Sequence, residues 1–175
     1  MKKILMLVVV VMAAISSVNA QKMYLGGGIS LWRDDDADNT SFSISPEIGY
    51  NLSDKWAVGG QLIYAHAHQD EGLKVNSFAI APYARFTYYQ NKVVDLFLDM
   101  GLGISSTKVK HQDSETGFEI GIKPGIAINL NNQFSIVAKV GFAGYRDDYY
   151  ISSPSNGFGV GVDSQNISFG LFYKF

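Results

Sequence analysis

Two histidines, His66 and His68, lie two residues apart in the stretch HAH and are the first candidates for chemistry. In a strand this spacing places both on one face, near the outer end of the strand, where two imidazoles can share a metal ion. A structural zinc site needs four ligands and a catalytic zinc site needs three. The spacing offers no third ligand, so we expect no metal here.

Asp34, Asp36 and Asp38 alternate in the run DDDAD, with the spacing of ligands for a hard cation. A calcium loop of the EF-hand type would then need Gly at position 39 and Glu at position 45, where the chain has Asn39 and Ser45. A solvated acidic loop is the better interpretation. Weak bridging to lipopolysaccharide through divalent cations is left open.

The glycine-rich stretches LGGGIS and GFGVGV do not precede a helical pattern, so they do not predict a phosphate-binding loop. No set of nucleophile, base and orienting group can be assembled from the spacing of the polar residues. We therefore expect neither an enzyme nor a bound cofactor.

The first 20 residues have the pattern of a secretory signal peptide. Lys2 and Lys3 precede an apolar run at residues 4–15, and small residues end the segment at Ala20. The apolar run is shorter than the roughly 20 residues that a membrane-spanning helix needs, which disfavours a retained anchor. Cleavage after Ala20 is predicted, which leaves residues 21–175 as one domain.

The composition of the mature chain excludes several kinds of protein. Of the 14 basic residues, 12 remain after loss of Lys2 and Lys3, against 16 acidic residues, for a net charge of −4. No basic stripe is present that would bind nucleic acid. The chain has no cysteine, which excludes disulfides and thiolate metal sites.

Alternation of apolar and polar residues recurs along the mature chain and predicts strands. Eight strands are expected, at about residues 22–32, 41–52, 56–67, 76–88, 93–106, 117–130, 133–145 and 162–175. Tight turns at 53–55, 89–92 and 131–132 alternate with longer polar connections at 33–40, 69–75, 108–116 and 146–161. The order predicts an all-β fold, an eight-stranded antiparallel up-and-down barrel.

The charged side chains of these strands share one face, opposite the bulky apolar ladders. An eight-stranded barrel has a lumen just wide enough for side chains, and that face carries mostly small residues between its charges. We therefore predict a transmembrane β-barrel with apolar residues toward lipid. Four acidic and four basic residues should pair in a closed lumen, because unpaired buried charges are costly: Glu47, Arg85, Asp95, Asp99, Glu119, Lys123, Lys139 and Lys174.

Aromatic residues on the apolar face gather at the strand ends beside the tight turns. They predict a girdle at one membrane interface, formed by Tyr50, Trp56, Phe86, Tyr88, Phe134 and Tyr173. A second group, predicted on the same face, lies toward the other end at Phe42, Tyr64, Phe78, Phe118 and Phe142. The last long connection adds aromatics that form either a binding surface or part of the outer girdle: Tyr145, Tyr149, Tyr150 and Phe158.

Three prolines, Pro46, Pro82 and Pro124, interrupt the apolar ladders at mid-strand. Proline lacks the N–H that a central strand donates, so it is found at strand edges and bulges. We expect local β-bulges at these positions.

The signal peptide, SPEIGYNL at 45–52, IAPYARFTYY at 80–89, GIKPGIAINLNNQFSI at 121–136 and the terminal FYKF together resemble a known family. The chain is similar to small outer-membrane barrels such as the OmpA transmembrane domain and OmpX. It most resembles the porin-family-like outer-membrane β-barrel domains of Bacteroidetes. The resemblance implies that Tyr173 and Phe175 form a C-terminal signal for the barrel-assembly machinery.

The same reading predicts a monomer in the cell outer membrane, with both termini in the periplasm and lipid or lipopolysaccharide around it. Its expected role is that of a structural or surface-interaction protein acting through the extracellular loops. A narrow, porin-like channel for ions or very small solutes is the alternative.

Overall fold

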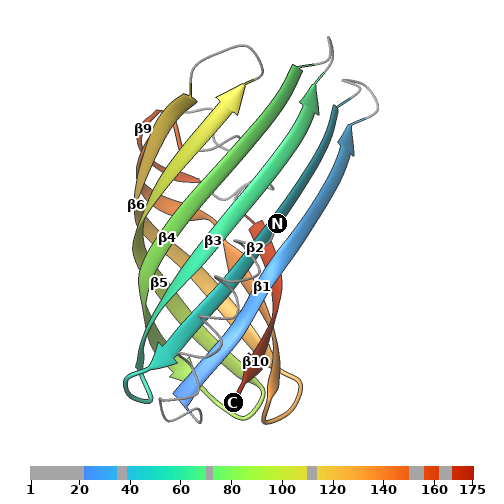
Figure 1. Ribbon diagram of the computed structural model, residues 1–175. Helices are drawn as coiled ribbons and strands as arrows, with labels where there is room; N and C mark the ends of the chain where they lie inside the picture. The colour runs from blue at the N-terminus through green and yellow to red at the C-terminus, as the bar shows by residue number, and fades with distance from the viewer. Residues whose placement is uncertain (1–21, 35–38, 70–72, 110–113, 150–155, 162–166) are drawn as a thin grey trace.

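The computed structural model describes residues 22–34, 39–69, 73–109, 114–149, 156–161 and 167–175. The predicted signal peptide therefore lies outside the described residues, as do Asp36, Asp38 and Tyr150. The strands form one closed antiparallel sheet (Figure 1). They are β1 (Met23–Asp34), β2 (Asn39–Asn51), β3 (Trp56–Gln69), β4 (Leu73–Gln90), β5 (Val94–Val109), β6 (Ser114–Asn129), β7 (Phe134–Val140), β8 (Phe142–Asp147), β9 (Gly157–Gly161) and β10 (Ile167–Lys174).

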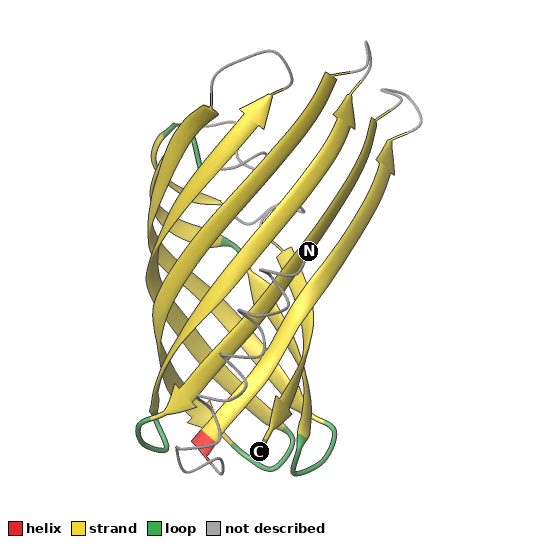
Figure 2. Cartoon of the chain, viewed as in Figure 1, coloured by secondary structure: helices red, strands yellow, loops and turns green. Residues whose placement is uncertain are grey.

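The ten labelled strands form the eight antiparallel strand positions of the barrel, two of which are each divided into two segments. We call each of the eight positions a stave. β7 and β8 follow each other along one stave, because both pair with β6. β9 pairs with β8, and β10 pairs with β7, so these two strands share the last stave. The predicted eight-stranded antiparallel barrel is confirmed. Figure 2 shows almost only strand, and no helix in the described ranges is long and apolar enough to cross a membrane.

Pairing of the first and last strands closes the barrel. β1 pairs with β10 from Tyr24↔Lys174 to Gly27↔Leu171, and with β2 along its whole length. The N–H of Phe175 donates to the carbonyl of Met23 at 3.1 Å. Over residues 24–27 of β1 this pairing satisfies backbone groups that would otherwise face lipid, at a cost of several kcal/mol each.

Side chains alternate between lumen and exterior along each stave, as β5 illustrates. Phe97, Asp99 and Ser105 are buried, whereas Leu102 and Ile104 on the opposite face are 42% and 54% exposed. Buried charges and exposed branched apolar residues are the reverse of the arrangement in a soluble barrel. This face-by-face polarity is what a lipid environment requires.

One residue, Gly141, changes the alternation in the seventh stave. Gly141 has φ 82°, in the left-handed region that glycine occupies without strain. Beyond it Phe142 is 6% exposed and faces the lumen, although the sequence placed it on the outer aromatic face. The prediction for Phe142 was wrong because the strict two-residue period does not hold across this break.

The prolines differ in whether a bulge accompanies them. The register is the same on both sides of Pro46 and of Pro82, in the pairings with both neighbouring strands, so the prediction of a bulge was wrong at these two positions. Beside Pro124 the register of β6 with the seventh stave shifts by one residue, from Ile122↔Ala143 to Gly125↔Lys139. A bulge therefore does lie opposite Pro124, with its extra residue on the neighbouring strand at the break around Gly141. A further register shift, in β4, falls between Thr87 and Tyr89.

The strands at the long-connection end extend further than their apolar ladders predicted. β3 and β4 pair as far as Gln69↔Leu73, and β5 and β6 as far as Lys108↔Ser114. Backbone pairing does not depend on the polarity of the side chains, so the hairpins continue beyond the apolar belt. The predicted connections at 69–75 and 108–116 are accordingly shorter.

The close approach of neighbouring strands at Gly144 in β8 leaves no space for a side chain. A Cβ added there would overlap the carbonyl oxygen of Ile120 and the Cα of Gly121, both backbone atoms that cannot move aside. Gly60 in β3 has no atom within 4 Å of an added Cβ. We expect Gly144→Ala to lower the free energy of unfolding in detergent by about 1–3 kcal/mol and Gly60→Ala to change it by less than about 0.5 kcal/mol. Equal effects in urea titrations would contradict this packing.

Candidate functional site

The centre of the lumen holds four charged side chains from four strands, which we call the central charge layer: Glu47, Arg85, Asp99 and Lys139. Arg85 donates from Nε to Asp99 Oδ1 at 2.6 Å and from Nη2 to Asp99 Oδ2 at 2.8 Å. Such two-point pairing is among the strongest that a guanidinium makes. The Nη2 atom also donates to Glu47 Oε1 at 3.1 Å.

Lys139 completes the central charge layer from the opposite wall. Its ammonium lies 2.8 Å from Glu47 Oε2 and 3.0 Å from Asp99 Oδ2. Two cations therefore contact two carboxylates, and all four side chains are at most 9% exposed. The layer carries no net charge, which reduces the cost of burying its ions.

Strand register explains how these residues meet. Arg85 of β4 is directly opposite Asp99 of β5, so their inward side chains are cross-strand neighbours. Glu47 comes from β2 and Lys139 from β7, more distant staves whose inward side chains reach across the narrow lumen.

Four aromatic rings surround the Arg85 guanidinium. Its Cζ lies 4.0 Å from the ring centroid of Phe97 and between 5.2 and 5.5 Å from the other three, Tyr83, Tyr24 and Phe172. Cation–π attraction is strongest where water is excluded, as here. The Tyr83 hydroxyl donates to Glu47 Oε1 at 2.5 Å and pairs with the Tyr24 hydroxyl at 2.7 Å.

A second group of charges lies toward the long-connection end. Glu119 accepts from Lys123 Nζ and from Arg146 Nε, each at 2.6 Å. The Arg146 guanidinium lies 3.8 Å from the centroid of the Phe142 ring. The inward turn of Phe142 after Gly141 therefore gives Arg146 an aromatic partner.

A third group lies toward the short turns. Lys174 Nζ is 3.6 Å from Asp95 Oδ2 and donates to Asn129 Oδ1 at 2.9 Å. Asn129 Nδ2 donates to Asp95 Oδ2 at 3.2 Å, and the Ser135 hydroxyl donates to Asn129 Oδ1 at 2.8 Å. This group is wetter than the central charge layer, because the Lys174 side chain is 36% exposed.

Two cavities lie on either side of Arg85. The larger, of about 340 Å³, lies toward the short turns and is lined by residues that include Arg85, Asp95 and Lys174. The smaller, of about 20 Å³, is lined by residues that include Asp99, Lys139 and Glu119. The two cavities share no lining residue. The smaller has room for about one water molecule.

Comparison with known proteins agrees with this architecture. The sequence matches the outer membrane protein beta-barrel domain over residues 4–175. The chain belongs to this family. It is an outer-membrane β-barrel, and the resemblance predicted from its sequence motifs is confirmed.

Solved structures of similar fold include two small outer-membrane proteins. Neisserial surface protein A (NspA) has a TM-score of 0.52 and 13% identity, with coverage of 87% of this chain and 96% of NspA. The Yersinia pestis outer membrane protein Ail, in phospholipid bilayer nanodiscs, has a TM-score of 0.52 and 16% identity, with coverage of 89% of this chain and 99% of Ail. At these identities the likeness establishes a shared fold alone. No match is found among curated proteins.

All eight charges that the sequence assigned to the lumen of this barrel point inward and contact an opposite charge. Arg146 was missed because it was assigned to the last long connection, and the break at Gly141 hid its inward position. Phe97 and Tyr83 were also missed as partners of Arg85. The alternation of residues in the predicted strands already placed both side chains on the inward face, so they could have been identified from the sequence.

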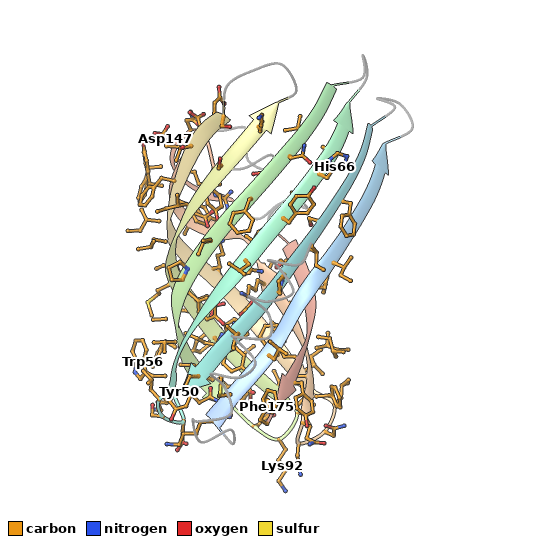
Figure 3. All side chains as sticks on the ribbon, viewed as in Figure 1. Tyr50, Trp56, His66, Lys92, Asp147 and Phe175 are labelled. Atoms are coloured by element: carbon orange, nitrogen blue, oxygen red, sulfur yellow. The ribbon has the colours of Figure 1, made fainter. Side chains whose placement is uncertain are left out.

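The residues predicted as an aromatic girdle face outward near the short turns. Figure 3 shows the labelled Tyr50, Trp56 and Phe175 at that end of the barrel. Trp56 packs on Phe86 with ring centroids 4.9 Å apart, and Tyr173 lies 5.1 Å from Phe134 and 5.0 Å from Phe175. Tyr88, at the β4 register shift, is 53% exposed. Aromatic rings therefore lie on the barrel exterior at the short-turn end, where the predicted girdle places them.

The aromatics of the last long connection do not form one exposed group. Tyr149 is fully buried beside Ile63 and Ala79, so its assignment to an exposed surface or an outer girdle was wrong. The backbone at Asp148, just after β8, has φ 47°, and the side chain of the next residue, Tyr149, is buried. Phe158 and Tyr145 are 85% and 40% exposed, on paired positions of β9 and β8.

Of the two histidines, the structure describes the side chain of His66. His66 Nδ1 lies 2.9 Å from Asn76 Oδ1, which also accepts from the Tyr64 hydroxyl at 3.1 Å. Nowhere in the described ranges do three metal-ligating side chains of the His, Cys, Asp or Glu type come together. The alternating aspartates of DDDAD lie largely in the range 35–38, outside the described residues.

Proposed function

We propose that this outer-membrane barrel is a structural or surface-interaction protein with a closed lumen. The observation that carries the proposal is the central charge layer, where Arg85, Glu47 and Asp99 separate two cavities that share no lining residue. The side chains meet at 2.6–3.1 Å, which leaves no room for a hydrated ion between them. If the lumen is closed, other molecules contact the protein at its long-connection end and on its outer surface.

A narrow channel is the alternative, and current measurement separates the two. We expect the wild-type protein, refolded and inserted in a planar bilayer, to give no stable conductance steps. Arg85→Ala removes the side chain that lies between the two cavities and should produce steps, because water can then connect them. Protease resistance of the inserted barrel serves as the control for folding.

Stable steps from the wild-type protein would contradict the closed lumen. They would establish a channel if their size also shifted on neutralising Glu47 or Glu119, whose charges face the lumen. Silence of the wild type beside a conducting Arg85→Ala variant would leave surface interaction as the function.

We further propose that the long-connection end faces the cell exterior and that the short turns and both termini face the periplasm. Outer-membrane barrels have short periplasmic turns and longer extracellular loops. NspA, which shares the fold, is described as a surface protein. The exposed end of β6 would then be part of the surface available to partners, with lipopolysaccharide around the barrel and the assembly machinery engaging Tyr173 and Phe175 during biogenesis.

The absence of cysteine makes this orientation testable by labelling. Glu115, at the long-connection end, and Asn132, in a short turn, are both exposed. On intact cells a membrane-impermeant maleimide should label Glu115→Cys and should label Asn132→Cys only after the outer membrane is permeabilised. Labelling of Asn132→Cys on intact cells, with Glu115→Cys protected, would reverse the proposed orientation.

A further inference from the structure

The outer wall of the barrel changes from apolar to polar toward the long-connection end of β3, β4 and β5. Ile80 of β4 lies opposite Ile104 of β5, and the two side chains are 49% and 54% exposed. Further along β4, Asn76 lies opposite His66 of β3 on one side and Lys108 of β5 on the other. We call these three residues the outer polar row. Figure 3 shows the labelled His66 toward that end of the barrel.

The outer polar row faces away from the lumen. Its neighbours along β3 and β4 are buried: Ala65, Ala67, Val75 and Ser77. Thr107, which precedes Lys108, is hydrogen-bonded to the Ser77 hydroxyl at 2.8 Å on the lumen side. The side chains of Asn76 and Lys108 are exposed, so molecules outside the barrel can reach them.

Basic residues on this outer wall gather at one end only. In the described strands β2–β6 they occupy four outward register positions, all at the long-connection end: His66, His68, Lys74 and Lys108. The carboxylates of these strands occupy the opposite face, toward the lumen: Glu47, Asp95, Asp99, Glu115 and Glu119. The wall at the outer polar row therefore has cations without neighbouring carboxylates on the same face.

The outer polar row presents hydrogen-bond donors to its surroundings. Asn76 Oδ1 accepts from the Tyr64 hydroxyl at 3.1 Å and from His66 Nδ1 at 2.9 Å, so this oxygen is occupied. Asn76 Nδ2 has no hydrogen-bond partner in the described part of the chain, and Lys108 Nζ has no ion-pair partner there. Both nitrogens can only donate. Adjacent donors, one of them charged, suit an anion.

A lipid phosphate fits this position better than an acidic protein does. Neighbouring strands lie about 4.8 Å apart, so a phosphate above Asn76 is within reach of the longer side chains on either side. The next outward pair, Tyr64 opposite Phe78, begins an exposed apolar wall that continues through Ile80. In a membrane such a wall is covered by acyl chains. One molecule that carries both acyl chains and a phosphate can contact the wall and the row together.

We propose that the outer polar row binds a phosphate of lipid A, the membrane anchor of lipopolysaccharide, while the wall at Tyr64, Phe78 and Ile80 contacts its acyl chains. The inference rests on the proposed orientation, which places the long-connection end in the outer leaflet, where lipopolysaccharide lies. It deepens that proposal by assigning the contact to one wall of the barrel.

Lipids that differ in their phosphates test the proposal. The protein is refolded in a nonionic detergent, and bound lipid is counted by native mass spectrometry during titration. We expect diphosphoryl lipid A to bind at least about tenfold tighter than lipid A without its phosphates. Dioleoylphosphatidylglycerol should also bind more weakly than diphosphoryl lipid A, because a phosphate monoester carries more negative charge than a diester.

Variants link the binding to the outer polar row. Asn76→Asp keeps the oxygen that accepts from Tyr64 and His66 but replaces the amide donors with negative charge, and should weaken binding of diphosphoryl lipid A at least about tenfold. Lys108→Gln removes one cation and should weaken it about three- to tenfold. Lys92→Gln is the matched control, because Lys92 is exposed at the opposite end of the barrel (Figure 3). It should leave the affinity unchanged.

Each outcome decides the proposal, provided that each protein resists protease as a folded barrel. Phosphate-dependent binding that falls in Asn76→Asp and Lys108→Gln but not in Lys92→Gln supports it. Equal binding of the two forms of lipid A overturns it, as does an equal loss in Lys92→Gln. Equal binding of dioleoylphosphatidylglycerol overturns the assignment to lipid A. Because the purified protein is used, the result does not depend on orientation in the cell, and a wrong orientation is detected by the maleimide labelling alone.

Discussion

The pairing of charges inside a lumen that excludes most water is the constraint on which this barrel depends. Arg85 carries its guanidinium to the middle of the barrel, where it is 8% exposed and surrounded by four aromatic rings. An uncompensated charge there would cost several kcal/mol. Glu47 and Asp99 compensate it, and Lys139 balances the two carboxylates.

The lumen must also be narrow for these pairs to form, and the small inward residues make it so. Gly49 faces the Tyr24 ring and Gly125 faces the Phe97 ring, so that a Cβ at either position would overlap an aromatic side chain. Small residues thus admit the rings, and the rings shield the charges from water. The exterior carries bulky apolar side chains instead, because their exposure to lipid costs no free energy of hydration.

Sequence reasoning predicted the parts of the structure that follow a two-residue period. Asp95, Asp99, Glu119 and Lys123 were assigned to the lumen because alternation places each of them opposite an apolar ladder. The same reasoning failed at Gly141, where the left-handed backbone changes the alternation and brings Phe142 inward. The break lies opposite Pro124, where a bulge was expected, but the sequence did not indicate that the extra residue would lie on the neighbouring strand.

Contacts between distant strands were also beyond the sequence. Opposite charges in a narrow lumen predict pairing, but not that Lys139 of β7 reaches Glu47 of β2. Partner choice depends on barrel shear and strand register, which the positions of turns specify only approximately. Tyr149 was expected outside, since nothing in a polar connection indicates that one of its aromatic side chains is buried.

A double-mutant cycle on Arg85 and Asp99 tests the central claim most directly. The free energy of unfolding in detergent is measured for the wild type, Arg85→Gln, Asp99→Asn and the double variant, with Arg85→Gln and Glu115→Gln as the distant control pair. We predict a coupling energy of at least about 1.5 kcal/mol for Arg85 with Asp99, and less than about 0.5 kcal/mol for the control. A coupling near zero for Arg85 with Asp99 would contradict the claim that the central charge layer holds the barrel together.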